Sequence, residues 1–343
     1  MIIVINLLTI DEAFEKAGMK RHLLLGNGFS IALKPNIFSY ESLYKNADFS
    51  KADHIPKLFD LLETKDFEAV IRLLVSMAKI VKAYPDLPES VAEQIREDAE
   101  TIKNVLAEAI AKNHPKLPFD IEDEQYAHCR AFLDNFANIY TLNYDVLLYW
   151  TLMNVDVDEI DIDCDDGFRH PEGNEDAPYV SWQQAHRPTV YYLHGALHLF
   201  DAGHEITKYT WSKTRTPIVE QIRLALDEEK YPLFVAEGNS EDKLEKIMHN
   251  AYLHKGLRSF ESIGGSLFVF GHSFDDNDDH IIGKIPFSKV QKLFVGLFGN
   301  PVSEQNREII RKANRYSDQR SQMPRKRPLE VFFYDVSSAQ VWG

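Results

Sequence analysis

The sequence has few cysteines and no long apolar run, and each absence removes a class of protein. Only Cys129 and Cys164 are cysteines, and they do not form a Cys-x-x-Cys pair. A disulfide framework and a four-cysteine zinc site are therefore excluded. Residues 1–10 are apolar, but they lack a basic lead and are too short to span a bilayer. We interpret them as part of the fold, and expect no membrane association and a cytoplasmic location.

The sequence also has little positive charge. Its 343 residues include 38 Lys and Arg against 53 Asp and Glu, a net charge of -15, and the densest basic run is only residues 325–327. This balance argues against a broad surface for nucleic acid, although a local pocket could still bind a phosphate group through backbone dipoles. The 44% hydrophobic and 27% charged residues are typical of a soluble globular protein with a large core.

A glycine turn follows the first apolar run. Residues 23–25 are all leucine, and they lead into Gly26-Asn27-Gly28-Phe29-Ser30. This pattern predicts a strand that turns into a helix, with the N–H groups of Gly28, Phe29 and Ser30 and the Ser30 hydroxyl facing a phosphate. A third glycine and a P-loop lysine are absent, so a simple glycine turn after a core strand is the alternative.

A helical block comes next. Apolar residues recur at spacings of three and four over residues 59–84, 90–113 and 123–138, so we predict a helical insertion over residues 57–138. No second strand with a terminal acidic residue follows the glycines at the distance that a nicotinamide dehydrogenase requires. A dehydrogenase is therefore disfavoured.

The later part of the chain alternates between apolar runs and helical patterns. Expected strands cover residues 139–142, 190–193, 232–235, 266–270, 292–295 and 329–334, and expected helices cover 240–262 and 303–316. This alternation predicts an α/β fold with a mostly parallel sheet and helices on both faces. Ligands of such sheets bind beyond the carboxyl ends of the strands. Polar residues gather there, at Asn143 to Asp145, His194-Gly195, Gly271 to Ser273 and Gly299-Asn300.

Four of these motifs, in this order, resemble those of the sirtuin superfamily. They are Gly26-Asn27-Gly28-Phe29-Ser30, Thr141-Leu142-Asn143-Tyr144-Asp145, Leu193-His194-Gly195 and Gly271-His272-Ser273-Phe274. The resemblance extends over residues 21–334 and implies a single Rossmann-like domain over residues 1–343 that binds NAD.

The chain departs from the protein deacylases of that superfamily. It lacks their zinc-binding cysteines, and residues 36–40 read Asn-Ile-Phe-Ser-Tyr where the deacylases have a Pro-Asp-Phe-Arg signature. The chain is more similar to zinc-free sirtuin-like domains of bacteria, many of which hydrolyse NAD in anti-phage defence. The resemblance therefore implies an NAD hydrolase that serves as a defence effector.

Two residues suit the cleavage of a nicotinamide–ribose bond. Asn143 can hold the ribose hydroxyls or the attacking water, because its amide both donates and accepts. His194 is the natural base. No metal is needed, because nicotinamide leaves as a neutral group. A helix cap for Asn143 and a core position for His194 are the alternatives.

Further residues would contact NAD outside the reacting bond. Gly271 and Ser273 would approach the adenosine ribose and the phosphates, and Asn300 would reach the adenine ribose unless it only forms a turn. Phe29 would line the nicotinamide side or form part of the core. Asp145 belongs to this set, although a helix cap suits it better. We expect His272 to be a surface imidazole.

Two acidic runs are weak metal candidates. Asp161, Asp163 and Asp165 resemble a calcium loop, but the required glycine is displaced by one position. The run over residues 275–279 is expected to cap the helix that follows it. We therefore predict no metal site.

The leading hypothesis is an NAD glycohydrolase that releases nicotinamide and ADP-ribose or a cyclic form of it. An ADP-ribosyl transferase and a non-catalytic module that binds NAD or ADP-ribose are the alternatives. The resemblance also implies that the activity is controlled by a homo-oligomer or by an activating partner protein. Residues 59–138 and 200–217 are candidates for that contact, and both could equally be lids or core extensions.

Overall fold

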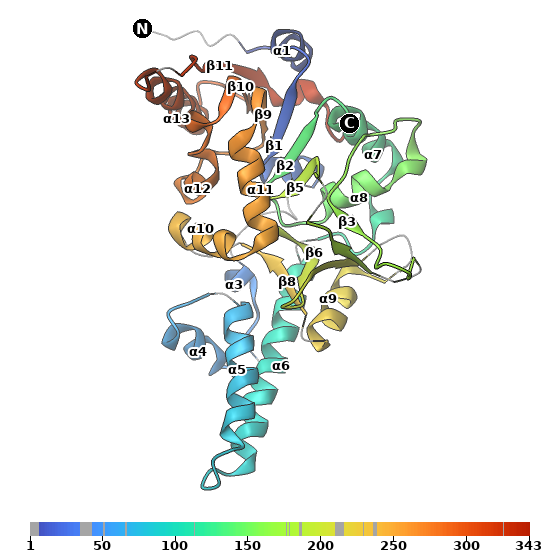
Figure 1. The fold of residues 1–343 in the computed structure, drawn as a ribbon, viewed down its shortest axis with the longest axis vertical. Helices are drawn as coiled ribbons and strands as arrows, with labels where there is room; N and C mark the ends of the chain where they lie inside the picture. The colour runs from blue at the N-terminus through green and yellow to red at the C-terminus, as the bar shows by residue number, and fades with distance from the viewer. Residues whose placement is uncertain are drawn as a thin grey trace.

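A computed structural model describes most of the chain. It covers residues 7–34, 43–50, 52–65, 67–112, 114–175, 177, 179–184, 187–209, 216–228, 230–235, 239–324 and 326–343. Residues 1–6, the 36–40 segment and part of the 200–217 segment, all considered above, lie outside these ranges. Two β-sheets with surrounding helices form the body, and a pair of long helices projects from it (Figure 1).

The larger sheet has six strands, and every neighbouring pair is parallel. Its spatial order is β11-β10-β9-β1-β2-β5. The strands are β1 (Arg21–Leu25), β2 (Asn138–Thr141), β5 (Val190–Tyr192), β9 (Gly264–Phe270), β10 (Lys289–Leu297) and β11 (Glu330–Asp335). The predicted α/β fold with a mostly parallel sheet is confirmed.

The strand order places a topological switch at the centre of this sheet. From β1 the chain adds β2 and β5 on one side, and it then returns to add β9, β10 and β11 on the other. This is the doubly wound order of dinucleotide-binding folds, and the crevice for a ligand opens where the winding changes direction. Here that point lies at the carboxyl ends of β1 and β9.

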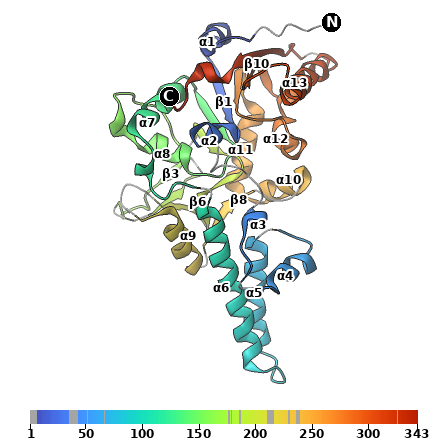
Figure 2. The same cartoon turned by 180° about the vertical axis from the view of Figure 1, so that it is seen from behind.

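Helices cover both faces of the parallel sheet (Figures 1 and 2). Tyr140 pairs with Leu24 of β1, and Phe270 pairs with the next residue of β1. Because side chains alternate along a strand, Tyr140 and Phe270 point to opposite faces. Tyr140 contacts Phe260 of α11 (Ala251–Ser262), and Phe270 contacts Phe132 of α7 (Asp123–Leu133). Burial on both faces explains why these strands read as continuous apolar runs.

A second, antiparallel sheet is built from strands that lie between β2 and β9 in the sequence. It contains β3 (Phe168–Arg169), β4 (Tyr179–Trp182), β6 (Gly195–Asp201), β7 (Ile206–Tyr209) and β8 (Tyr231–Phe234), in the order β3-β4-β7-β6-β8. The interpretation of residues 232–235 as a strand of the parallel sheet was wrong, because β8 pairs antiparallel with β6. A short apolar run predicts a strand but carries no information about its partner.

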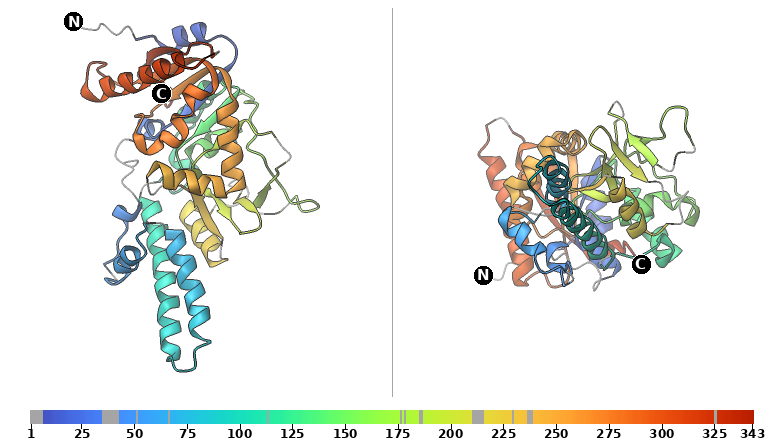
Figure 3. Two further views of the ribbon diagram at one scale, coloured as in Figure 1. Left: turned by 60° about the vertical axis from the view of Figure 1, so that its left-hand side comes forward. Right: turned by 90° about the horizontal axis from the view of Figure 1, so that it is seen from below.

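A helical hairpin extends away from the body (Figures 1 and 3). The helix expected over residues 59–84 is divided into α4 (Ile55–Leu61) and α5 (Phe67–Val81), and Glu63 between them has a positive φ of 49°. Helix α6 (Glu89–Lys112) returns alongside α5. The third expected helix ends at Leu133, and it covers the sheet instead of joining the hairpin.

Most of the other helices flank the two sheets, but the short helix at Leu43–Asn46 packs against the hairpin. These other helices are α1 (Ile10–Ala17), α2 (Gly28–Leu33), α3 (Leu43–Asn46), α8 (Leu147–Met153), α9 (Ile218–Asp227), α10 (Ser240–His249), α12 (Asp279–Ile282) and α13 (Glu304–Ser321). Within the described ranges, no helix combines the length and the apolar character needed to cross a membrane.

Candidate functional site

The glycine turn after β1 is packed directly against the loop after β9. Gly28 N–H donates to the carbonyl of Gly271 at 2.7 Å. A Cβ atom on Gly28 would lie 2.6 Å from the Cα of Gly271, and one on Gly26 would lie 2.7 Å from its carbonyl oxygen. Glycine is therefore required at both positions by the close approach of two backbones at the switch point.

The backbone ladder continues past the ends of β2 and β5. Leu142 N–H donates to the last residue of β1 at 3.0 Å, and Leu193 N–H donates to the last residue of β2 at 2.9 Å. Asn143 and His194 follow these two residues in the chain. Both therefore lie at the carboxyl edge of the sheet, on the β2 and β5 side of the glycine turn.

The N–H groups expected to hold a phosphate already have backbone partners. Gly28 donates to Gly271, and Phe29 and Ser30 each donate within the turn at 3.0 Å. An incoming phosphate would have to compete with these three bonds. The Asn27 Oδ1 atom is buried, and it has no partner among the residues that the structure describes. A ligand hydroxyl or amide at the turn would supply the missing donor.

Phe29 belongs to the core. Its side chain is 1% exposed, its ring centroid lies 5.0 Å from that of Trp342, and its carbonyl accepts a 2.8 Å hydrogen bond from the Trp342 indole. The interpretation of Phe29 as a buried aromatic is confirmed, and little of its ring is left to line a nicotinamide site.

Ser30, Asn143 and Asp145 form one buried hydrogen-bond network. The Asn143 amide donates to the Ser30 hydroxyl at 3.0 Å and to the Gly26 carbonyl at 3.1 Å. The Ser30 hydroxyl donates to Asp145 Oδ2 at 2.5 Å. The other Asp145 oxygen accepts from Leu147 N–H at 2.9 Å, at the first residue of α8, whose N-cap residue is Val146. The network joins the first two loops of the site.

The remaining predicted NAD contacts are Gly271, Ser273 and Asn300. Ser273 and Asn300 are exposed, in the loops after β9 and β10. The Asn300 side chain accepts from Val302 N–H at 3.0 Å, which is the bond expected of a turn residue. Gly271, with φ of +67°, needs glycine for its backbone conformation as well as for its packing.

His194 meets a second histidine from the other half of the sheet. Its Nε2 atom lies 2.9 Å from Nε2 of His280, and the two rings are stacked. Both side chains are 4% exposed. His280 lies on α12, after β9, and its Nδ1 atom lies 3.3 Å from the Ser240 hydroxyl.

Asp278 is the centre of charge in this cluster. Its Oδ1 atom lies 3.0 Å from Lys243 Nζ and 4.0 Å from His194 Nε2. Its Oδ2 atom lies 3.0 Å from His272 Nε2. The expectation that His272 is a surface imidazole was wrong, since it is 7% exposed and its Nδ1 atom accepts from Phe274 N–H.

The protonation states of the cluster follow from burial and from these contacts. Burial lowers the pKa of His194 to about 3 and the pKa of His280 to about 4. Burial alone would raise the pKa of Asp278. However, its hydrogen bond with His272 and the positive charge of Lys243 are among the contacts that more than offset that effect and lower the pKa of Asp278. At neutral pH the site therefore presents two neutral imidazoles beside a carboxylate.

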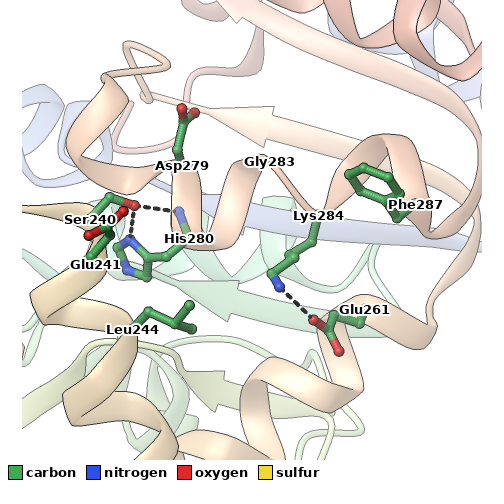
Figure 4. Close-up of a pocket in the computed structure, with 9 residues that line it drawn as sticks. All are labelled: Ser240, Glu241, Leu244, Glu261, Asp279, His280, Gly283, Lys284 and Phe287. Atoms are coloured by element: carbon green, nitrogen blue, oxygen red, sulfur yellow. Dashed lines mark hydrogen bonds and ion pairs between the residues drawn. The ribbon is translucent and has the colours of Figure 1, made fainter.

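A cavity of about 590 Å³ opens beside this cluster (Figure 4). It is lined by Ser240, Glu241, Leu244, Glu261, Asp279, His280, Gly283, Lys284 and Phe287. The glycine turn, Asn143 and His194 are not part of its lining. His280 connects the two regions, because it lines the cavity and contacts His194.

His280, Asp278 and Lys243 were not predicted as site residues from the sequence. Residues 278–280 did carry a signal for a site, because a carboxylate and a histidine lie two residues apart shortly after a strand end. The acidic run around them was instead interpreted as a helix cap. Lys243 carried no local signal, because it lies on the amphipathic helix α10.

Comparisons with known proteins identify a family without assigning an activity. No curated protein matches the chain. A family match spans residues 23–342, which run from Leu23 in β1 to Trp342, the residue that packs on Phe29. The match therefore includes every residue of the site described above. The chain belongs to the family described as Domain of unknown function (DUF4917).

Proposed function

We propose that the protein is an NAD glycohydrolase, which cleaves the nicotinamide–ribose bond and releases nicotinamide and ADP-ribose or its cyclic form. The observation that carries this proposal is the position of Asn143 and His194 on consecutive strand ends, beside a glycine turn at the switch point. Dinucleotides bind at such switch points. The order of the four sirtuin-like motifs supports NAD as the dinucleotide.

The reaction needs little from the protein beyond orientation and a weak base. The C1′–N bond breaks, its electron pair neutralises the nicotinamide ring, and a water oxygen bonds to C1′. Attack on a cationic carbon makes that water strongly acidic, so His194 can accept its proton despite a lowered pKa. Because the Nε2 atoms of His194 and His280 are 2.9 Å apart, a proton taken at one nitrogen of His194 can be passed on from the other.

The test is nicotinamide release by the purified protein in a chelating buffer. We expect His194→Ala and Asn143→Ala to lose at least about a hundredfold in turnover, which is the typical contribution of a positioned base. His204→Ala, on an exposed turn, is the matched control and should retain wild-type activity. Circular dichroism establishes that each variant is folded. Full activity in both site variants would overturn the proposal.

Product analysis separates this proposal from its alternatives. Label from NAD that remains on protein or nucleic acid would indicate an ADP-ribosyl transferase. NAD that is bound and recovered intact would indicate a binding module. The anti-phage role and the cytoplasmic location are parts of the proposal that rest on the family resemblance.

We further propose that the active form is a homo-oligomer assembled through the helical hairpin. Helix α5 contributes Val70, Ile71 and Leu74 to the core, yet it also carries an exposed apolar stripe. The stripe consists of Leu73, Met77, Ile80 and, in the turn after α5, Tyr84. Its alternating spacings of four and three residues are those of a coiled-coil seam, which packs best against an equivalent seam. A second copy of this chain provides one.

A further inference from the structure

His194, Asp278 and His280 bring three potential metal ligands together. One ligand atom from each residue lies within 4.8 Å of the other two, and among the described residues this is a group able to surround an ion. The ligands come from the β5–β6 junction and from the two short helices after β9. The cluster is therefore held by several elements of the fold and does not depend on one acidic loop.

The chemistry of the three donors fits a transition metal of the zinc class. Imidazole nitrogen and carboxylate oxygen are the donors of many three-ligand zinc sites, which keep a fourth position for water or substrate.

The distances between the donor atoms are close to those in a site that holds a metal ion. Bonds of about 2.0–2.1 Å in a tetrahedral arrangement place ligand atoms roughly 3.3 Å apart. The two Nε2 atoms are 2.9 Å apart, and His194 Nε2 is 4.0 Å from Asp278 Oδ1. An ion would open the first distance and close the second by less than an ångström each.

Outer contacts already orient two of the ligands. The Ser240 hydroxyl lies 3.3 Å from His280 Nδ1, and His272 Nε2 lies 3.0 Å from Asp278 Oδ2. Such partners fix the ring and the carboxylate in metal sites. Lys243 acts in the other direction, because its ammonium lies 3.0 Å from Asp278 Oδ1 and competes with an ion for that oxygen.

The cavity in Figure 4 gives an ion a route to the cluster. His280 lines it, together with the carboxylates of Glu241, Glu261 and Asp279, and only Lys284 adds a positive charge to the lining. Lys284 is itself paired with Glu261 at 3.1 Å. The excess of negative charge favours the entry of cations.

We propose that His194, Asp278 and His280 bind one divalent ion of the zinc class. This differs from the expectation drawn from the sequence, which considered cysteine ligands and the two acidic runs and predicted no metal site. The site goes beyond the proposed NAD chemistry and does not depend on it. An ion on His194 Nε2 fixes the ring proton on Nδ1, so the metal-bound histidine cannot also act as a base.

The test measures metal binding to the full chain without NAD. After treatment with a chelator and its removal, the protein is titrated with Co²⁺ by visible absorption and with Zn²⁺ by calorimetry. We expect one ion per chain. His280→Gln and Asp278→Asn should each weaken binding at least tenfold, as even outer contacts contribute that much. His204→Gln is the matched control and should bind like the wild type.

A second variant keeps the proposal testable if the buried substitutions impair folding. Lys243→Gln removes the competing ammonium and should tighten Co²⁺ binding several-fold. Absence of binding to the wild type, or equal affinity in the wild type, Lys243→Gln and His280→Gln, would overturn the proposal. Neither result depends on NAD cleavage, which is measured in a chelating buffer, so the two proposals can fail independently.

Discussion

The Nε2 atoms of His194 and His280 lie 2.9 Å apart, although 86 residues separate them in the sequence. His194 follows β5 and His280 follows β9, and β1 and β2 lie between these strands in the sheet. The contact therefore joins the two halves of the doubly wound sheet on the side where their ligand crevice opens. Substitutions at this contact should affect both halves of the site.

The junction of the two sheets depends on a glycine. Gly195 has φ of +71°, and a Cβ atom there would lie 2.0 Å from the Leu233 carbonyl oxygen. Gly203 has a similar φ of +83° but open space around it. Gly203→Ala should cost about 1–2 kcal/mol of unfolding free energy from backbone strain alone. We expect Gly195→Ala to cost clearly more, because β8 must also move.

Urea unfolding of both glycine variants measures the difference. Equal losses of stability in the two variants would show that the Leu233 contact relaxes at no cost. Such a result would contradict a close junction between β6 and β8.

We expect the Ser30 hydroxyl to contribute mainly to the stability of the fold, and not to ligand binding. It donates to Asp145 at 2.5 Å and accepts from Asn143 at 3.0 Å, and it is fully buried. Ser30→Ala leaves a buried carboxylate short of a donor, so we expect a loss of about 1–3 kcal/mol in unfolding free energy. Ser273→Ala, at an exposed position, should change stability by less than about 0.5 kcal/mol.

Thermal and urea unfolding separate these two serines, and NAD titration completes the comparison. If Ser30→Ala is as stable as the wild type and only weakens NAD binding, the hydroxyl serves the ligand and the buried network is dispensable.

The sequence predicted those parts of the fold that local patterns determine. The inner strands of the parallel sheet are largely buried on both faces, so they contain uninterrupted apolar runs, as in residues 23–25. The loops at their carboxyl ends could then be placed by a general rule. The antiparallel sheet was missed because its strands are short and lie among acidic and aromatic residues, as in the two-residue strand β3.

The site was only partly predictable for a similar reason. Asn143 and His194 follow apolar runs directly, so their placement at the sheet edge required no knowledge of distant contacts. The partners of His194 come from positions 278 and 280, and Ser30 reaches Asp145 across 115 residues. No local pattern contains such pairings, because they depend on the strand order and on the close packing of the loops.

His22 should make stability depend on pH. It is 3% exposed on β1, and burial, with a smaller effect of Lys20, lowers its pKa from 6.5 to about 4. Between these two values the unfolded chain binds a proton that the folded chain does not. Unfolding free energy should therefore fall as the pH falls from 6.5 to 4, by up to about 1.4 kcal/mol per pH unit from this residue. Above pH 7 the effect should vanish.

His22→Leu removes that proton and should reduce the slope between pH 6.5 and 4. Urea unfolding at several pH values measures the difference from the wild type, and His204→Leu provides a comparison at an exposed histidine. Parallel curves for the wild type and His22→Leu would show that His22 titrates equally in both states.

The exposed stripe on α5 should control the size of the particle. Leu73→Glu combined with Ile80→Lys places charges within the seam, at side chains that are 39% and 57% exposed. We expect the mass from light scattering to fall to that of a monomer with little change in unfolding free energy. Leu61→Glu, on α4 outside the stripe, is the control and should leave the mass unchanged. A wild-type chain that is monomeric at every concentration would favour an activating partner instead.

Zinc should inhibit the cleavage of NAD if both proposals hold. The ion and the catalytic proton compete for the imidazole of His194, so nicotinamide release should fall as Zn²⁺ occupies the cluster and should recover on chelation. Lys243→Gln removes the ammonium that lies 3.0 Å from Asp278. The Zn²⁺ concentration that halves the variant's own uninhibited rate should therefore be several-fold lower than for the wild type. Activation by Zn²⁺ would assign His194 to metal binding and the base to another residue. Unchanged turnover with zinc bound would show that His194 takes no part in proton transfer.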